Sequence, residues 1–524
     1  ASLPTAEMRN GNFAGFTNSA GNAITLYDPW TTNTTTWARQ PFPNNQLPQS
    51  KQSPLSKYLL EVTQMPNIAG VNGFSAPNYA GPWGPFNHQW TTATRIDHRL
   101  GDNDSFYARY SQGNYRTRGQ FYGVPSMDYN KVPGNTQGTT SPNWSFAFSH
   151  VHTFSPTFFN ELLITGTRTK FDVATGDPTR CYDCEMGLPN PFNVNMWPGL
   201  YNLAFNNSYQ FETQNGNGFY AFYGIIDSNA TKIAGKHELQ FGVHYRPDRM
   251  NLLPQQQQTG GSFSWASTGT ALYDPTTART NPAATPFTGD QFANLYLGLG
   301  RYNNQLNRGM FYARSKEYAA YFQDNWRVTS RLTLNLGLRY DLFPPYYEKN
   351  NAVSSFDTSD KTVVLGNSLD ELFRLGATFP AIVNRLQSMG MKFKTWDQAG
   401  WNQTMINTSK DGWGPRLGFA YRLGDGASSM VLRGGYRVSY FHFVMGGWAA
   451  RMRSNAPMTA RFYGPYGDME QSAYSPDAIG NYMMRSVPVY ISGQNTATGL
   501  VQPEDARSLS RGSGGVSFFG QDMP

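Results

Sequence analysis

The chain has 524 residues, of which 15% are aromatic and 15% are charged. Soluble globular proteins carry about 25% charged residues, and a chain of this length needs no disulfide framework to build a core. The net charge of +7 is spread along the chain, without the basic patch of a nucleic-acid-binding protein, so we expect no nucleic-acid partner. The mean hydropathy is −0.53, and the absence of any apolar run near 18 residues excludes a transmembrane helix.

Five hairpins follow residues 1–87, each with a short turn rich in Gly, Asp, Asn, Ser or Pro, as tight hairpins require. Residues 1–87 lack strands of membrane length, and we expect them to form an extracellular loop region. The expected strand pairs are His88–Arg99 with Ser105–Tyr115, Asn143–Phe154 with Thr157–Phe171, Phe219–Ala234 with Lys236–Asp248, Tyr312–Arg327 with Leu332–Phe343, and Trp413–Leu423 with Ser429–Phe441.

The clearest strand is Leu332–Phe343, in which Leu and Tyr alternate with polar residues at a period of two. Such alternation puts the two sets on opposite faces of a strand. About ten alternating residues is the length of a tilted strand that crosses a bilayer. We therefore predict an all-β fold, an antiparallel up-and-down transmembrane β-barrel with about ten strands in residues 88–441. The alternation is ambiguous in the second hairpin, where Leu162, Leu163 and Ile164 are consecutive.

The alternation divides the strand residues into two sets with different expected surroundings. The residues expected to face lipid are Leu239, Phe241, Val243, Leu332, Leu334, Leu336, Leu338, Leu417, Phe419 and Leu432. The residues expected to form a polar wall around the lumen are Arg95, Asp97, Arg109, Glu238, Arg246, Arg339, Asp341, Arg416, Arg433 and Arg437. We favour cross-strand ion pairs within this wall, and contact with a plug or a substrate is the alternative. The aromatic residues that fit interfacial girdles are Trp326, Tyr340, Trp413 and Tyr440.

Long segments at 116–142, 172–218, 249–311 and 344–412 separate the hairpins. Outer-membrane barrels have short periplasmic turns and long extracellular loops, so we expect these segments outside the cell. Within the last of them, Ser368 and Glu371 form a capping-box pattern, and apolar residues at helical spacing predict a helical loop over 368–390. We favour a lid packed on itself over a partner-binding surface. Residues 442–524 contain no clear hairpin and are expected to be an extracellular loop and C-terminal segment.

The only cysteines, Cys181 and Cys184, form a CxxC pair in a loop rich in Pro, Asn and Gly. This spacing is compatible with redox chemistry, half a zinc site or a local disulfide. A zinc site needs two more ligands, and none follows nearby. Because the loops are expected in an oxidising exterior, we favour the disulfide.

Sequence signatures of enzymes are absent: there is no GxSxG elbow, P-loop or HExxH motif, and we expect neither an enzyme nor a cofactor. His150 and His152 lie on one strand face and could bind a metal, but no third ligand is indicated nearby. We favour wall residues near the periplasmic rim and predict no metal site. Asp102 and Asp104 lie in a tight turn, where Asp commonly serves backbone hydrogen bonding.

Several stretches resemble TonB-dependent outer-membrane receptors of the Oar-like kind, common in Acidobacteria and related bacteria. They include TRIDHRLGDNDSFYARYS (94–111), SHVHTFSPTFFNEL (149–162), GKHELQFGVHYR (235–246), EYAAYFQDNWRVTSRLTLNLGLRYD (317–341) and GWGPRLGFAYRLGDG (412–426). The resemblance implies a barrel of about 22 strands around a plug domain, with a TonB box. This chain has no visible signal peptide, TonB box or plug, so it is interpreted as an internal fragment of a larger barrel. Closure of ten strands into a small barrel is the alternative.

The resemblance implies a receptor in the outer membrane of a diderm bacterium that takes up a scarce ligand, which could be a siderophore, a glycan or a peptide. Its implied partners are outer-membrane lipid, the extracellular ligand, and a plug domain and TonB complex outside this chain. A barrel-anchored adhesion or interaction protein without active transport is the alternative. A soluble, secreted carbohydrate-binding protein is a third interpretation.

Overall fold

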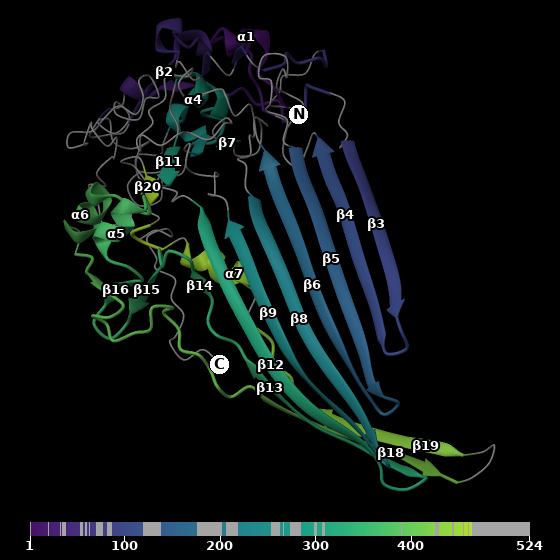
Figure 1. Ribbon diagram of the computed structural model, residues 1–524. Coiled ribbons are helices and arrows are strands. Elements are labelled where there is room, and N and C mark those ends of the chain that lie inside the picture. The colour runs from purple at the N-terminus through teal and green to yellow at the C-terminus, as the bar shows by residue number, and fades with distance from the viewer. Residues whose placement is uncertain are drawn as a thin grey trace.

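The computed structural model contains a curved sheet of long strands, with loops, helices and small sheets gathered at one end (Figure 1). It describes residues 2–463 apart from 19, 32, 34–37, 53–55, 58–59, 62, 70–76, 81–85, 119–137, 175–201, 206–217, 253–261, 266, 273–284, 298–300, 306–309, 389, 425–428, 443–444, 454 and 459–460. None of the helices in these residues is long and apolar enough to cross a membrane.

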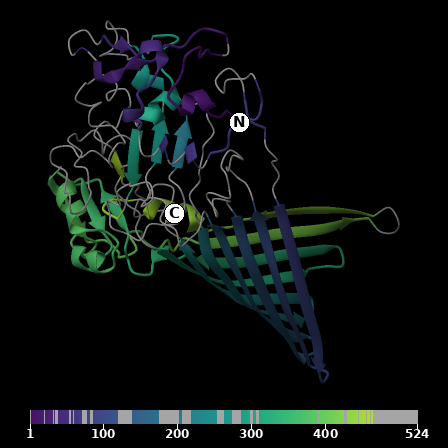
Figure 2. The same cartoon turned by 90° about the horizontal axis from the view of Figure 1, so that it is seen from above.

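The large sheet has eleven strands, ten of which lie in the order β19-β18-β13-β12-β9-β8-β6-β5-β4-β3, each antiparallel to its neighbours. Figure 2 shows how strongly the sheet curves. The strands are β3 (Phe86–Leu100), β4 (Asp104–Arg118), β5 (Gly138–Ser155), β6 (Phe158–Ala174), β8 (Gly218–Ala234), β9 (His237–Leu252), β12 (Phe311–Arg327), β13 (Leu332–Leu342), β18 (Trp413–Leu423) and β19 (Met430–Arg437), with the short β14 (Tyr347–Glu348) beside β12.

All five predicted hairpins are present, which confirms the antiparallel up-and-down arrangement. The short turns that the structure describes lie at one end of the sheet, called here the short-turn end. Glycines with positive φ such as Gly101 (65°) and Gly235 (61°) allow the chain to reverse there. The last strand is shorter than predicted, because β19 ends at Arg437 rather than at 441. Within the part of the chain that the structure describes, β3 and β19 are the two edges and the sheet is not closed.

The register resolves the ambiguous second hairpin. Leu162 lies opposite His150 and Ser228, whereas Leu163 lies opposite Ser149 and Asp227. Because residues directly opposite each other share a face of a sheet, the consecutive leucines point to different faces. The β5–β6 pair also has an irregularity between Thr153 and Ser155, close to its turn.

Smaller elements gather beyond the other end of the long strands. The short strands are β1 (Tyr27–Asp28) with β2 (Gln40–Pro41), a sheet of β20 (Arg461–Tyr463), β11 (Arg301–Gln305), β10 (Ser262–Trp265) and β7 (Asn202–Phe205), and a sheet of β15 (Ser354–Asp357), β16 (Thr362–Leu365) and β17 (Phe393–Thr395). The α-helices are α1 (Ala6–Arg9), α4 (Gln291–Leu297), α5 (Leu369–Arg374), α6 (Pro380–Ser388) and α7 (Met445–Met452), and the 3-10 turns are Pro29–Thr31, Pro43–Asn45, Gln49–Lys51 and Ser267–Thr270.

The helical loop forms where the sequence predicts it. Ser368 caps α5, and its hydroxyl accepts a hydrogen bond from the Glu371 amide at 3.3 Å. The reciprocal half of the capping box is replaced, because the Glu371 carboxylate pairs with Arg374 and the Ser368 amide donates to the side chain of Asn367. The pattern therefore predicted the position of the helix correctly, but only one of the two expected capping contacts is present.

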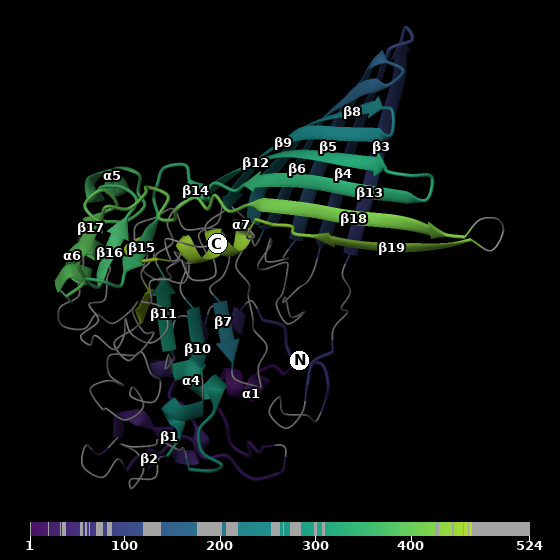
Figure 3. The ribbon, with the colours of Figure 1, turned by 90° about the horizontal axis from the view of Figure 1, so that it is seen from below.

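We call β15–β17, α5, α6 and α7 the cap, and Figure 3 shows these elements at the end of the long strands. Helix α7, which the sequence pattern did not predict, is buried against β12 through Trp448, whose ring centroid lies 5.7 Å from that of Phe311. Strand β16 contributes Val364 to this core and Val363 to a second core that contains Leu372 of α5. The cap is therefore a layered unit seated on the long strands.

Candidate functional site on the polar face of the sheet

The strand register separates the large sheet into two chemically different faces. All ten residues of the expected polar wall share one face: Arg95 lies opposite Arg109, Arg246 opposite Glu317, and the other members follow the same register. The ten residues expected to face lipid share the other face. We call these the polar face and the apolar face.

Large side chains of the apolar face are exposed over much of the sheet. Val243 is 58% exposed and Phe322 is 52% exposed. The other exposed members of this face are Trp90, Ile96, Leu100, Tyr110, Phe146, Phe154, Ile226, Phe241, Tyr318, Leu336, Leu338, Trp413, Leu417, Phe419, Tyr421, Leu423, Met430, Leu432 and Tyr436. Soluble monomers rarely expose contiguous apolar patches larger than a few hundred Å². An exposed apolar surface that extends over so many strands is typical of a face that contacts a membrane or another protein.

Ion pairs follow the middle of the polar face. The Arg339 guanidinium contacts the Asp341 carboxylate at 2.8 Å, and Arg246 contacts Asp248 at 3.0 Å. Arg95 and Asp97 form the same kind of pair at 2.6 Å. These pairs run along one strand, between residues two positions apart, and not across strands as the sequence suggested. The geometry follows from the period of two, which places both members on one face.

His244 makes contacts with carboxylates across strands in this region. The Nδ1 atom of His244 lies 2.6 Å from the Asp227 carboxylate, and its Nε2 atom lies 3.7 Å from the Glu317 carboxylate. His244 on β9 thus bridges carboxylates on β8 and β12. Sequence reasoning did not assign it a role. The register of the predicted β8–β9 hairpin contains the signal for the Asp227 contact, whereas the Glu317 contact depends on the pairing of β9 with β12 across a long connection.

The arginines nearest the β19 edge differ from the rest of the polar wall. Arg416 lies directly opposite Arg437, and Arg433 lies further along β19 toward the short turn. Among the described residues, none of these three arginines forms an ion pair with a carboxylate. They form a concentration of positive charge at this side of the polar face.

The polar face becomes apolar where it passes under the cap. On β12, Phe311, Ala313 and Ser315 are almost completely buried. The ring of His442 stacks on Tyr346 with centroids 4.1 Å apart, and its Nδ1 atom lies 3.4 Å from the Ser315 hydroxyl. Burial, assisted by the charge of Arg246, lowers the pKa of His442 to about 4. The imidazole is therefore neutral at pH 7 and packs as part of the seal between cap and sheet.

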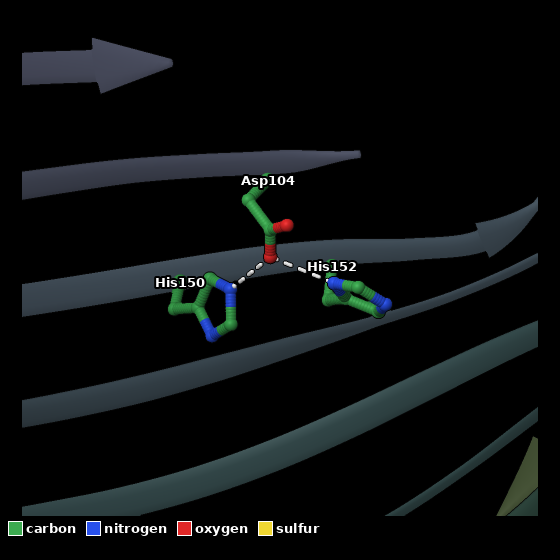
Figure 4. A group of neighbouring side chains, drawn as sticks. All are labelled: Asp104, His150 and His152. Carbon is green, nitrogen blue, oxygen red and sulfur yellow. Dashed lines mark hydrogen bonds and ion pairs between the residues drawn. The ribbon is translucent and has the colours of Figure 1, made fainter. Parts of the chain in front are cut away.

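Three side chains that could each supply one metal ligand meet at the short-turn end of the apolar face (Figure 4). One Asp104 carboxylate oxygen lies 2.8 Å from Nε2 of His150 and 2.7 Å from Nδ1 of His152. The expectation that no third ligand accompanies the two histidines is wrong, and the side chain of Asp104 is not confined to its turn. The sequence alone does not give the register of β4 against β5, which places Asp104 opposite His152 across a long connection.

The aromatic residues of the expected girdles lie near both ends of the apolar face, with one exception. Tyr340 and Trp413 pack together with ring centroids 4.5 Å apart, and Trp326 stacks on His237 near the short turns. Tyr440 lies beyond the end of β19, because the chain there turns toward the buried helix α7. Cys181 and Cys184 fall outside the described residues.

A family model described as an outer membrane beta barrel domain matches residues 1–508. No curated protein matches the chain. Among solved structures, FpvA of P. aeruginosa, bound to heterologous pyoverdines, is similar at 10% identity over 65% of this chain and 34% of that protein, with a TM-score of 0.31. The ferric-catecholate import receptor Fiu of E. coli K12 is similar at 12% identity over 64% of this chain and 42% of that protein, with a TM-score of 0.30.

The outer membrane transporter YddB of Escherichia coli gives 9% identity over 67% of this chain and 40% of its own, with a TM-score of 0.31. The chain thus spans between about a third and two fifths of the length of these three proteins. Similarities of this size carry no argument about function or ligand. The match of the family model rests on nearly the whole sequence and places the protein in the outer membrane.

Proposed function

Because this chain belongs to the outer membrane beta-barrel domain family, we propose that it forms part of the wall of a TonB-dependent receptor, which takes up a scarce extracellular ligand. The apolar face contacts lipid and the polar face lines the lumen. The short turns lie in the periplasm and the cap lies outside the cell. The Oar-like kind is the subgroup proposed, and the sequence stretches quoted above support it.

One observation carries this proposal: the same sheet exposes an apolar belt on one face and holds a charged surface, closed by a cap, on the other. Bilayer-spanning barrels alternate in this way, with lipid outside and a polar interior. An anchor needs only the outer belt. The ordered ion pairs and the arginine concentration on the inner face supply chemistry that faces the lumen.

The polar face offers a path with two distinct parts. Under the cap, buried Phe311 and Trp448 close the outer end of the wall. Below them lie fixed ion pairs, and toward β19 lie Arg416, Arg433 and Arg437 without a carboxylate partner in the described part of the chain. Unpaired guanidinium groups bind carboxylates and phosphates well, in bidentate geometry. They are the residues we assign to contact with an anionic ligand or with an acidic surface of a plug domain.

The domain organisation proposed with this function has a loop region at 1–87, wall strands and extracellular loops at 88–441, and an outer segment at 442–524. The plug domain and the TonB box are assigned to parts of the receptor outside these residues, as is the remainder of the barrel. The alternative is a barrel that only anchors surface loops for adhesion. The charged inner face favours transport over that alternative.

Uptake by cells distinguishes the two functions. Cells that display the native receptor in their outer membrane are given radiolabelled iron–siderophore complexes, oligosaccharides and peptides, with and without a protonophore. A transporter accumulates at least one of these ligands, and the protonophore abolishes the accumulation. Arg416→Glu combined with Arg437→Glu is expected to reduce uptake, whereas Arg374→Glu, on exposed helix α5, is the matched control. Surface binding without accumulation, unaffected by the protonophore, rejects transport in favour of adhesion.

A further inference from the structure

The histidine and aspartate side chains at the short-turn end have the composition and geometry of a divalent metal site. The candidate ligand atoms of Asp104, His150 and His152 all lie within 4.8 Å of one another, and this is the one such group of three among the residues that the structure describes. We propose that this group binds a late first-row divalent transition metal, with Zn²⁺ as the representative ion. The site lies on the apolar face and is independent of the transport path.

The ligand set suits this class of ion. Two neutral imidazoles and one carboxylate form a common donor set for Zn²⁺, and imidazole ligands favour zinc, copper, nickel and cobalt over magnesium or calcium. The three side chains are between 26% and 34% exposed. Because the site lies beside the short turns, at the edge of the proposed lipid-facing belt, water from the interface can fill a fourth coordination position, as tetrahedral zinc requires when the protein supplies three ligands.

The distances between the three side chains are close to those around a bound ion. Asp104 lies 2.8 Å from the His150 nitrogen and 2.7 Å from the His152 nitrogen. Around a tetrahedral ion with bonds of about 2.0–2.1 Å, neighbouring ligand atoms lie about 3.3 Å apart. Loading thus lengthens each of these two contacts by about half an ångström and also brings the two nitrogens, which lie within 4.8 Å of each other, to about 3.3 Å. Side-chain rotations supply these movements. The backbone stays in place, because the three residues lie on paired strands.

The backbone and the neighbouring rings preorganise the ligands. His150 and His152 are two positions apart on β5 and share a face, and Asp104 on β4 lies directly opposite His152. The His150 ring stacks on Phe106 with centroids 4.3 Å apart and an interplanar angle of 5°. The His152 ring packs against Phe154 at 4.4 Å, close to perpendicular. Rings held in this way lose less freedom when they bind a metal.

The position of the site gives it a structural role. At the short-turn end, β4 is joined to β3 and β5 is joined to β6, so β4 and β5 are covalently connected only through the far end of the sheet. An ion held by Asp104 and the two histidines would fasten one hairpin to the next at this free end. Because the bound ion favours the folded state by mass action, we expect metal to raise the resistance of the barrel to unfolding.

A second pair of residues provides an internal control. His237 on β9 contacts Asp324 on β12 at 2.7 Å, also on the apolar face near the short turns and also between two hairpins. This pair has a single imidazole and is therefore not expected to bind zinc tightly. It separates the effect of a His–Asp contact from that of metal ligation.

The test is zinc binding to the complete receptor that contains this chain, solubilised in detergent and stripped with EDTA. Cys181 and Cys184 are changed to serine so that no thiol at these positions competes for the metal. Competition with a chromophoric chelator is expected to show one tightly bound Zn²⁺ per chain. Asp104→Asn, His150→Ala and His152→Ala should each weaken binding by more than about tenfold, since even loss of an outer-shell partner costs 10–100-fold. His237→Ala should leave it unchanged. Retention of the folded band in unheated gels identifies variants that still fold.

Two measurements on protein in which Asp104, His150 and His152 are unchanged keep the proposal testable if those variants misfold. Co²⁺ should give the intense visible absorption of a low-coordinate site, and zinc should protect His150 and His152, but not His237, from modification by diethylpyrocarbonate. Failure to bind zinc at micromolar concentration overturns the proposal. So does binding that persists unchanged in folded Asp104→Asn, or protection that is equal at all three histidines.

Discussion

A charge placed in the middle of the apolar face gives the sharpest test of the proposed membrane orientation. We choose Val243→Arg, because Val243 is 58% exposed and lies opposite Ala320 and Ser228, two small side chains that leave room for the substitution. The matched control is Gln323→Arg. Gln323 lies on the polar face between Gln240 and Gly337, so a longer polar side chain has both space and polar neighbours there.

The expected magnitude follows from the depth of Val243 in the bilayer. It lies six residues along β9 from His237, which begins the strand at the short-turn end. With a rise of about 3.3 Å per residue and a tilt of about 45°, this separation corresponds to about 14 Å of height. The apolar band of a barrel is about 25 Å tall, so Val243 lies close to its midplane, where Arg costs about 2–4 kcal/mol.

The free energy of unfolding should therefore fall by about 2–4 kcal/mol in Val243→Arg and by less than about 1 kcal/mol in Gln323→Arg. The measurement is denaturant unfolding of the complete receptor, folded into phosphatidylcholine vesicles and followed by tryptophan fluorescence. Equal, small effects of both substitutions would show that the two faces meet the same solvent, and the lipid assignment would be refuted. A larger effect at Gln323 would reverse the assignment.

Three further predictions concern the cap. Trp448→Ala should lower the free energy of unfolding of the cap by about 3–5 kcal/mol, because it empties the centre of the core beneath α7. Limited proteolysis should then cleave the cap faster, and an unchanged cleavage rate would contradict this packing. His442 has its pKa lowered to about 4, so an unfolded cap binds a proton more readily than the folded one, and cap stability should fall as pH decreases from about 6.5 toward 4. Proteolysis at several pH values measures this pH dependence of cap stability, and His442→Phe should reduce it. If the pH dependence is the same in that variant, another group causes it. Ser368→Ala removes the N-cap hydrogen bond of α5 and should lower the stability of this helix by about 0.5–2 kcal/mol. Hydrogen exchange of the Glu371 amide should become faster, and unchanged exchange would argue against this hydrogen bond.

The strands were predictable because their signal is local. Alternation in Leu332–Leu342 and short glycine-containing turns identify both members of a hairpin, and the turn fixes their register. The same alternation is enough to place Arg95 and Leu334 on opposite faces of the sheet. It does not distinguish ion pairs across strands, which we favoured, from the pairs along a strand that Arg95 and Arg339 form, because both are compatible with a period of two.

Elements that depend on distant contacts were not predictable in this way. Helix α7 contains Gly446 and Gly447, which have low helix propensity, and its stability comes from the burial of Trp448 against β12. The group around Asp104 was missed for a similar reason. The turn chemistry of the aspartate and the alternation of the two histidines are visible separately, but only the β4–β5 register brings them together.

Strand β16 connects the packing of helix α5 mechanically with the packing of helix α7 on β12. Successive residues of this strand point into different cores: Val363 and Leu365 pack with Leu372 of α5, while Val364 packs with Trp448 of α7. A strand filled on both sides cannot slide or rotate without disturbing both packings at once. A displacement of α5 that moves β16 therefore also disturbs the packing of α7 over β12.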